Sequence, residues 1–329
     1  MAEGKAADIR LELQTTSDVR IVHPLHKLVT CLLPQPLRSD EQGDTLSATA
    51  VSGLNTVLAQ STVLWEFYGS AVLGLSPNLA VKIGFAIDYD HISTLEYINK
   101  HAPDVPTPAV YGVLKTDIRT YLFMTRINGA SLDKLWPALD EAQKTSIRDQ
   151  LTPILKSLRA IPRPPLEDGK LTFGGGCPRR CKDVRRHERI ASYPIGSEEE
   201  FNAFLLNTEG RKTLGSKAKM LRSFLRSDHQ IVMTHSDLHP RNIMAVMEPV
   251  EEVSDRVADE TSTSRVRVVG LIDWELSGWY PEYWEYTKAL HTVVPGVAME
   301  DWWAYIPIDA IGKWPGEYAI DMMISRYVD

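Results

Sequence analysis

Apolar residues come in short runs through the part of the chain that follows Ser61. The segments STVLWEFYGSAVLGL and NLAVKIG are rich in valine, leucine and aromatic residues, and the turn-forming residues SPN separate them. They predict a β-hairpin or meander. HISTLEYINKHAP then predicts a short helix that ends before Pro103, and TPAVYGVL and TYLFMTRI predict two more strands. The first third of the chain therefore alternates strand, strand, helix, strand, strand.

The rest of the chain has mainly a helical period. TSIRDQLTPILKSLRAI contains Pro153, an expected kink, yet its apolar residues share one helical face: Ile147, Leu151, Ile154, Leu155 and Leu158. Ser197 and Glu200 form a candidate capping box for the helix EEEFNAFLL. KTLGSKAKMLRSFLRS predicts another helix, weakened by Gly215. Strands return at QIVMTHSD, NIMAVME and RVRVVGLIDW, and helices follow. The acidic segment PVEEVSDRVADETSTS predicts an exposed insertion between the last two strands.

Composition narrows the class of protein. The 329 residues suffice for two lobes or domains, and 43% hydrophobic with 24% charged residues is typical of a globular protein. The net charge of −7 gives no support to a nucleic-acid partner. No run approaches the roughly 18 apolar residues of a membrane helix, and MAEGKAADIRLELQ lacks the apolar core of a secretory signal. Three cysteines make no disulfide framework, so we expect a reducing, cytoplasmic compartment.

The polar segment THSDLHPRNIM lies between two predicted strands. It contains His235, Asp237 and Asn242 at the spacing H-x-D-x-x-x-x-N, and Asp273 ends the next apolar strand. This is the arrangement of a phosphoryl-transfer site. Asp237 would accept the proton of a substrate hydroxyl, while Asn242 and Asp273 would offer oxygen ligands to Mg²⁺. The alternative is a polar loop that matches by coincidence.

Two further residues fit such a site. Lys82 lies inside the apolar strand NLAVKIG, where an ammonium group needs a partner or solvent. Glu96 lies in the following predicted helix and is a candidate partner turned inward. The alternatives are a lysine pointing outward from an edge strand and an exposed helical glutamate. The order Lys82, Glu96, Asp237, Asn242, Asp273 favours the site.

In this set of motifs the chain resembles the aminoglycoside phosphotransferase and choline-kinase-like superfamily, especially its fungal branch. The motifs span residues 61–310: LAVKIG, TLEYINKHAPDVPTPAVYGV, YLFMTRINGASLDKLW, VMTHSDLHPRNIM and VVGLIDWELSGWYPEYWEYTKAL. The resemblance implies an α+β, protein-kinase-like fold of two lobes. Residues 1–60 would be a peripheral extension packed on the N-lobe, residues 61–125 the small β-rich N-lobe, and residues 126–329 the helical C-lobe.

The resemblance also implies a function. The protein would be a kinase that uses ATP or GTP and Mg²⁺ to phosphorylate a hydroxyl of a small molecule, with no obligate protein partner. The catalytic residues would be Asp237, His235 and Asn242. Asp237 would be the base, and His235 would support the catalytic loop. Asn242 and Asp273 would be the Mg²⁺ ligands. Glu285 would brace the loop from below.

The same resemblance implies nucleotide contacts. Lys82 would bind the α- and β-phosphates and pair with Glu96. Ser70 would donate to a phosphate from YGSAVLG, a loop poor in glycine for this role. Backbone groups of a hinge at residues 124–127, including Thr125 and Ile127, would contact the purine.

Departures from the protein-kinase pattern leave alternatives open. Trp274 and Glu275 follow Asp273, and Ser236 stands where protein kinases have arginine, which disfavours a protein-directed enzyme. A degenerate protein that binds nucleotide or a partner without phosphoryl transfer is the main alternative. Sugars, aminocyclitols, choline-like amines and secondary metabolites all fit as acceptors. His239 is either structural or part of the substrate cleft.

The segment CPRRCKDVRRH also has two interpretations. Cys177, Cys181 and His187 supply three zinc-type ligands without a fourth, so they are either a metal site or reduced thiols and a histidine. The arginines of this segment predict either a lid that attracts an anionic substrate or a solvated basic loop. In GWYPEYWEY, Glu282 and Tyr283 face an acceptor pocket in one interpretation, and aromatic packing is the other.

Overall fold

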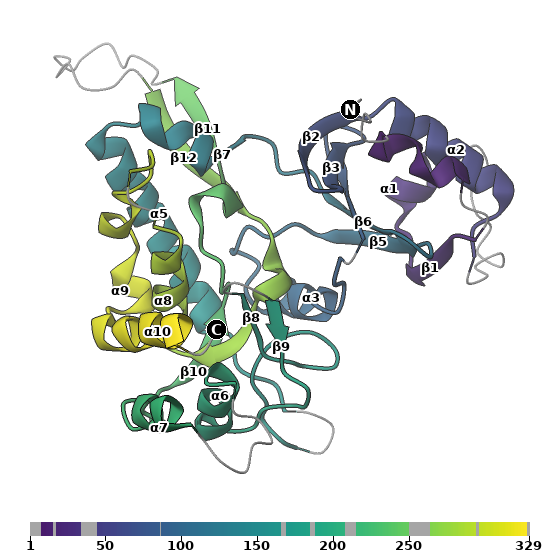
Figure 1. Cartoon of the computed structure of the whole chain (residues 1–329). Coiled ribbons are helices and arrows are strands. Elements are labelled where there is room, and N and C mark those ends of the chain that lie inside the picture. Colours follow the sequence, from purple (N-terminus) through teal and green to yellow (C-terminus); the bar gives the residue numbers. More distant parts are fainter. Residues whose placement is uncertain are drawn as a thin grey trace, which may run out of the picture. The chain divides into compact units, whose positions relative to one another are not determined.

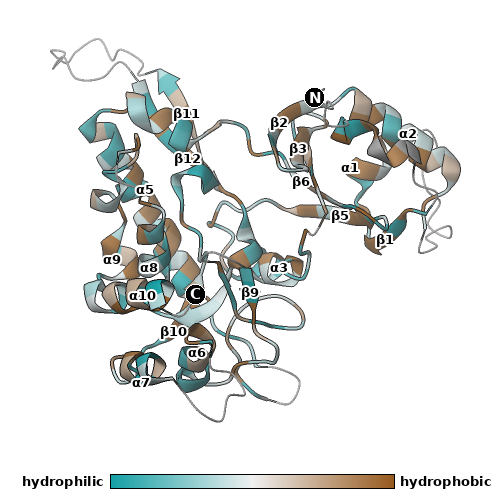
Figure 2. Cartoon of the chain, in the orientation of Figure 1, coloured by the Kyte–Doolittle hydropathy of each residue, from teal (hydrophilic) through white to brown (hydrophobic). Residues whose placement is uncertain are grey.

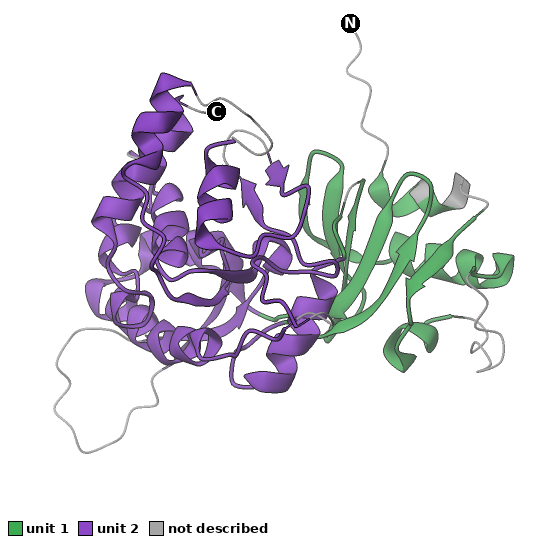
Figure 3. Cartoon of the chain, turned by 90° about the horizontal axis from the view of Figure 1, so that it is seen from below, with its two compact units in different colours: residues 1–89, 108–128 green, residues 90–107, 129–329 purple. Residues whose placement is uncertain are grey.

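The computed structural model in Figure 1 describes residues 8–15, 18–33, 45–85, 87–165, 169–184, 188–207, 215–249, 264–293 and 296–327. The chain divides into two compact units, coloured separately in Figure 3. Unit 1 contains Met1–Tyr89 and Pro108–Asn128, and unit 2 contains Asp90–Thr107 and Gly129–Asp329. The predicted helix after the meander, α3 (Ile92–His101), lies in unit 2.

Six strands within the described part of unit 1 form one antiparallel sheet in the order β1-β5-β6-β4-β3-β2. Their bounds are Arg20–His23 (β1), Thr62–Phe67 (β2), Ser70–Gly74 (β3), Leu79–Gly84 (β4), Val110–Lys115 (β5) and Thr120–Thr125 (β6). The predicted turn at SPN is confirmed between β3 and β4. The run STVLWEFYGSAVLGL, expected as one strand, forms two, because the chain turns at Tyr68–Gly69 between β2 and β3.

The described residues among the first 60 belong to unit 1. They contain η1 (Ile9–Thr15), α1 (Lys27–Thr30), α2 (Ala48–Ala59) and the sheet strand β1. Leu54 and Leu58 of α2 pack with residues from one face of the sheet, including Leu73, Val81 and Phe123, in a single apolar core. This arrangement leaves the opposite sheet face outside that core.

The described part of unit 2 combines helices with small antiparallel sheets in the orders β10-β13, β12-β11-β7 and β8-β9. The strands are β7 (Ala130–Ser131), β8 (Lys182–Val184), β9 (Glu188–Ile190), β10 (Ile231–Thr234), β11 (Ile243–Pro249), β12 (Ser264–Leu271) and β13 (Gly278–Pro281). The longer helical elements are α5 (Glu141–Arg159), α6 (Glu198–Leu205), α7 (Ser216–Arg222), α8 (Trp284–His291) and α10 (Pro315–Tyr327). The shorter ones are α4 (Leu132–Leu135), η2 (Trp136–Ala138), η3 (Pro240–Asn242), η4 (Trp274–Leu276), η5 (Trp302–Ala304) and α9 (Ile308–Ile311). Helix α8 packs against α9 and α10.

Helix α5 has the buried face that the spacing of its apolar residues predicts. Four of the five predicted face residues are fully buried, and Figure 2 shows hydrophobic and hydrophilic residues alternating along the helix. Pro153 lies on the exposed side and does not end the helix. The helix begins earlier than predicted because Asp140 and Gln143 form a reciprocal capping box: the Asp140 carboxylate accepts from the Gln143 N–H at 2.8 Å.

We expect Asp140→Ala to lower the free energy of unfolding by about 1 kcal/mol, because the first turn of α5 loses its side-chain acceptor. Urea denaturation would measure the change. Asp149→Ala, at an exposed mid-helix position, is the control and should have a smaller effect. Equal losses in the two variants would contradict a role for the cap.

Two other helix predictions need correction. Ser197 caps α6 as predicted, but the Glu200 carboxylate accepts from the N–H of Gly196 and not from the N–H of Ser197, so the capping box is incomplete. Gly215 is the residue before α7 and does not weaken its interior. Most of the predicted acidic insertion, residues 250–263, lies outside the described residues.

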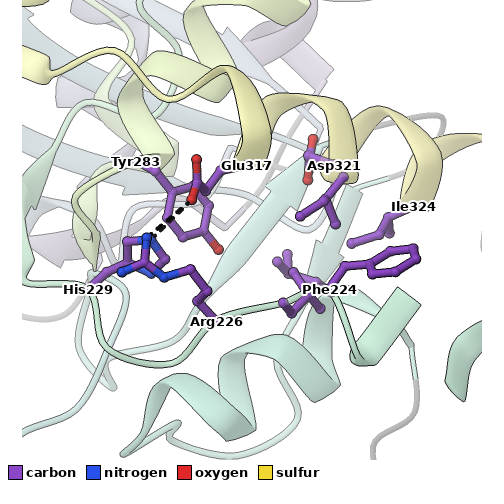
Figure 4. A pocket seen from close by; sticks show the side chains of 10 residues that line it. Phe224, Arg226, His229, Tyr283, Glu317, Asp321 and Ile324 are labelled. Carbon is purple, nitrogen blue, oxygen red and sulfur yellow. Dashed lines mark ion pairs between the residues drawn. The ribbon is translucent and has the colours of Figure 1, made fainter. Parts of the chain in front are cut away.

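A buried polar cluster links α10 to α6. The His229 ring is 2% exposed, and its Nδ1 lies 2.7 Å from Glu198 Oε1 on α6. Its Nε2 lies 3.5 Å from Glu317 Oε1 on α10, and Figure 4 shows both residues. The guanidinium Nη1 of Arg226 also lies 3.8 Å from Glu317 Oε1. The adjoining cavity has a volume of about 10 Å³, room for no more than about one water molecule, so this cluster is not a substrate site.

None of the helices within the described ranges is both long and apolar enough to cross a membrane.

Candidate active site

Two strand pairs bring the predicted catalytic residues together in unit 2. The loop from His235 to Asn242 connects β10, which pairs with β13, to β11, which pairs with β12. Ile272, directly after β12, donates its N–H to the carbonyl of Asn242 at 2.9 Å. The next residue is Asp273, so the hairpin places Asp273 beside Asn242 as the spacing predicts.

Hydrogen bonds hold one carboxylate oxygen of Asp237 in place and leave the other one open. Asp237 Oδ2 accepts from Asn242 Nδ2 at 2.8 Å and from Arg241 at 3.1 Å. None of the residues that the structure describes donates to Asp237 Oδ1. Asn242 Nδ2 also donates to the Asp237 carbonyl at 3.0 Å, which directs the amide oxygen of Asn242 away from Asp237. The arrangement therefore offers one carboxylate oxygen to a proton and one amide oxygen to a hard cation.

His235 has a structural role. Its Nε2 donates to the Ile272 carbonyl at 3.0 Å, and its Nδ1 accepts from the Asp237 N–H at 3.3 Å. The ring is fully buried and lies 4.5 Å from the Trp274 ring. Both ring nitrogens are occupied, so the His235 ring holds the loop in position.

Glu285 braces the loop from α8. One carboxylate oxygen accepts from the His235 N–H at 2.6 Å and the other from the Ser236 N–H at 3.1 Å. Complete burial raises the pKa of Glu285, while the nearby His235 and these hydrogen bonds oppose the rise. Ser236 has a left-handed backbone, with φ of 67°, which costs on the order of 1–3 kcal/mol for a residue other than glycine. The two bonds from Glu285 hold the loop in that conformation.

Asp273 also has a left-handed backbone, with φ of 67° and ψ of 62°. This turn ends β12 and begins η4, and the buried Trp274 fixes it by donating from its indole to the Leu271 carbonyl at 2.8 Å. The Asp273 side chain is thereby placed at the cleft that Asp237 lines. Asp273 and the amide oxygen of Asn242 are hard oxygen donors of the kind that fit Mg²⁺.

A cleft of about 810 Å³ opens beside these residues, entirely within unit 2. This volume suits a small-molecule substrate. Ser236, Asp237, His239 and Asp273 line one part of the cleft. Much of the remaining wall comes from β8, α8 and α10. It includes Lys182 of the predicted basic segment, Trp284 of the predicted aromatic segment, and three residues for which the sequence contains no signal: Asp183, Lys288 and Tyr318.

Part of the predicted basic loop is built into this wall. The Asp183 side chain is completely buried, forms an ion pair with Lys288, and accepts from Arg189 at 2.8 Å. Lys182 donates to the Glu275 carbonyl at 3.1 Å, and Arg180 donates to the Ala191 carbonyl at 3.0 Å. These cations hold backbone segments together, which differs from both a free lid and a solvated loop.

The predicted zinc ligands are only partly described. Cys177 is exposed and Cys181 is buried, whereas His187, with Arg185 and Arg186, lies outside the described residues. Within the described ranges, the side chains form no group of three or more His, Cys, Asp or Glu residues that could hold a metal ion. In GWYPEYWEY, Tyr283 is buried and packs against the His229 ring, which supports aromatic packing.

His239 lines the cleft and also has a structural role, so both interpretations considered for it apply. Its Nδ1 accepts from the Arg241 N–H at 2.9 Å as the cap of η3. Burial, helped by the nearby Arg241 cation, lowers the pKa of His239 to about 4. The ring is therefore neutral near pH 7.

Lys82 lies in unit 1 on β4, between β3 and β6, so the edge-strand alternative is wrong. Residues directly opposite one another in paired strands share a sheet face. Lys82 is opposite Val72 and Leu122, and Val72 is opposite Trp65. This face is the one opposite the apolar core of unit 1. Ser70 is on the same face, since a Cβ atom on Gly84 would meet its hydroxyl at 2.7 Å.

The other predicted nucleotide contacts lie at the end of β6 and on α3. Thr125 donates its N–H to the Ala109 carbonyl at 2.9 Å, whereas no described residue accepts from the N–H of Ile127. Glu96 is exposed, which corrects the expectation that it is turned inward, because Leu95 and Ile98 occupy the buried side of α3. Its pairing with Lys82 stays a prediction.

Residues 90–251 match the family model of the phosphotransferase enzyme family. The predicted resemblance is confirmed. The match to this phosphotransferase family includes the loop from His235 to Asn242 but neither Lys82 nor Asp273. No curated protein sequence matches the chain.

Solved structures show that the chain has the phosphotransferase fold. A thermostable aminoglycoside phosphotransferase APH(4)-Ia in a ternary complex with ADP and hygromycin B is 12% identical, with 81% of this chain and 84% of that chain covered and a TM-score of 0.51. A second structure of that enzyme, with AMP-PNP and hygromycin B, is 14% identical, with 81% and 83% covered and a TM-score of 0.52. The predicted α+β, protein-kinase-like fold is confirmed.

Proposed function

We propose that the protein is a small-molecule kinase that transfers the γ-phosphate of ATP or GTP to a hydroxyl group of a small metabolite or an aminoglycoside-like acceptor. The observation that carries this proposal is the turn containing Asp237 and Asn242, which opens together with Asp273 on the cleft of unit 2. The nucleotides and hygromycin B bound in the two similar structures of APH(4)-Ia support the same class of reaction.

Asp237 acts as the base in this proposal. Its unoccupied Oδ1 takes the proton of the acceptor hydroxyl as that oxygen forms a bond to the γ-phosphorus, and the bond from phosphorus to the β-phosphate oxygen breaks to release ADP or GDP. Arg241 and Asn242 hold Oδ2, so the carboxylate keeps its orientation through the reaction. Catalysis by this site is mainly positioning and charge neutralisation.

The oxygens of Asn242 and Asp273 would hold Mg²⁺, which supplies neutralising charge on the phosphates when bound. Lys82 and Ser70 share a sheet face and would contact the phosphates, with Glu96 as the partner of Lys82. The backbone at Thr125 and Ile127 would contact the purine, and the N–H of Ile127 is the better donor because that of Thr125 is already used. A cytoplasmic location stays a prediction.

Thermal denaturation with ATP and Mg²⁺ tests the nucleotide site directly. A ligand that binds only the folded state at 100 times its Kd raises the free energy of unfolding by about 2.7 kcal/mol. We expect a Mg²⁺-dependent rise in Tm for the wild type and its loss in Asp273→Ala, because the metal loses its carboxylate ligand.

The surface variant Asp149→Asn should keep the full rise in Tm. If neither ATP nor GTP stabilises the wild type at millimolar concentration, the proposed kinase activity is wrong. A binding or scaffolding role would then be the better hypothesis.

A further inference from the structure

We propose that His239 is a catalytic residue whose Nε2–H donates a hydrogen bond to the phosphoryl group as it moves between nucleotide and acceptor. This inference rests on the proposed kinase function and adds a residue to it. The observations that carry it are the position of His239 in the cleft and the hydrogen bond that occupies its other ring nitrogen.

The hydrogen bond at Nδ1 fixes the tautomer of His239. Nδ1 accepts from the Arg241 N–H at 2.9 Å, and a nitrogen that accepts carries no proton. The ring proton is therefore on Nε2, which makes that nitrogen a donor. A residue needed only as a cap would more commonly be Asn, Asp, Ser or Thr, whose side chains are too short to place a donor at the position of Nε2 as well.

The donor nitrogen is directed to the cleft. His239 is half-buried and lines the cleft together with Asp237 and Asp273. No described residue accepts from Nε2, and Nε2 is not among the buried polar atoms that lack a partner. It therefore reaches the space in which a substrate would lie.

The backbone of His239 belongs to the same turn as the base and the amide ligand. The His239 N–H donates to the Asp237 carbonyl at 2.7 Å, and the Asn242 N–H donates to the His239 carbonyl at 2.8 Å. The ring is thus fixed relative to both residues. In an in-line transfer the phosphorus lies between the attacking hydroxyl oxygen, which would be beside Asp237, and the leaving phosphate oxygen. The other oxygens on that phosphorus carry the charge of the group in transfer, so they are the acceptors that a donor on this turn would meet.

Two substitutions separate the two ring nitrogens. Asn places its side-chain oxygen near the position of Nδ1, so His239→Asn keeps the cap and removes the donor. Gln places its amide nitrogen near the position of Nε2, so His239→Gln keeps a donor and loses the cap. If His239 is only a cap, Asn is the better replacement; if it contacts the phosphoryl group, Gln is the better replacement.

The probe is ADP with Mg²⁺ and aluminium fluoride, a mimic of the phosphoryl group in transfer, with calorimetry as the measurement and no acceptor required. We expect His239→Asn to bind Mg²⁺–ADP within about two-fold of the wild type. It should bind the aluminium fluoride complex roughly 10- to 100-fold more weakly, as expected for one lost hydrogen bond to a charged group. His239→Gln should recover part of that loss although its Tm is lower.

The possible failures can be told apart. If the wild type gains no affinity when aluminium fluoride is added to Mg²⁺–ADP, the proposed kinase function is overturned and this inference with it. If the wild type gains affinity and His239→Asn gains as much, only the inference about His239 is overturned. The same holds if Gln is the poorer replacement for binding the mimic.

Discussion

Asp237→Asn is expected to lower kcat for phosphoryl transfer by about 10²- to 10⁴-fold, the usual contribution of a general base. The amide has nearly the shape of the carboxylate, so it can still accept from Asn242 and Arg241 at the position that Oδ2 holds. What it cannot do is take a proton at the position of Oδ1. The loss should therefore appear in kcat, with little change in nucleotide affinity.

The measurement requires an acceptor, chosen as the compound with the highest turnover in a panel of sugars, aminocyclitols, amino alcohols and aminoglycosides. Rates are compared for the wild type, Asp237→Asn and the surface variant Asp149→Asn, and the Tm shift with Mg²⁺–ATP is recorded for each. We expect the shift in all three proteins and the loss of rate in Asp237→Asn alone. A kcat within three-fold of the wild type would show that Asp237 is not the base.

Local patterns predicted the parts of the fold and site that are close in sequence. The turn between β3 and β4 follows from two apolar runs and a turn signal, and the buried face of α5 follows from its helical period. The catalytic loop and Asp273 were predicted because the spacing between the two strands already determines a hairpin. In each of these cases the residues that decide the structure lie within one element or its neighbour.

Contacts between distant segments had no such signal. Asp183 and Lys288 are more than a hundred positions apart, and neither the loop that contains Asp183 nor α8 shows which charge it will meet. The arginines and lysines of CPRRCKDVRRH are typical of an exposed basic loop until the fold supplies carbonyls for them. The complete capping box at Asp140 and Gln143 is a different case, because the D-x-x-Q pattern that forms it is local and can be recognised in the sequence.

Glu96 shows the limit of reading one residue from its neighbours. Its apolar neighbours favoured an inward side chain, yet in α3 the buried positions Leu95 and Ile98 leave Glu96 on the exposed side. Helical geometry alone would have given this result once the buried face was chosen. For Lys82 the strand order was needed, because the central position of β4 follows from pairing with β6, which is distant in sequence.

Asp183→Asn is expected to lower the free energy of unfolding by about 3–5 kcal/mol. Asp183 is completely buried, and Lys288 and Arg189 are 7% and 19% exposed, so the substitution leaves two cations in the protein interior without their counter-charge. Urea denaturation followed by tryptophan fluorescence would measure the loss. Asp149→Asn, which breaks a pair whose members are 39% and 62% exposed, should change stability by no more than about 0.5 kcal/mol.

The double variant Asp183→Asn with Lys288→Met distinguishes a charge effect from a packing effect. Removing one of the uncompensated cations should restore part of the stability lost in the single variant, because the remaining Arg189 also donates to backbone carbonyls of α6. If the effect comes from packing, the double variant should lose about the sum of the stabilities lost in the two single variants. If Asp183→Asn alone costs less than about 1 kcal/mol, the cations have found solvent, and the wall of the cleft is more open than the buried positions of Asp183 and Lys288 indicate.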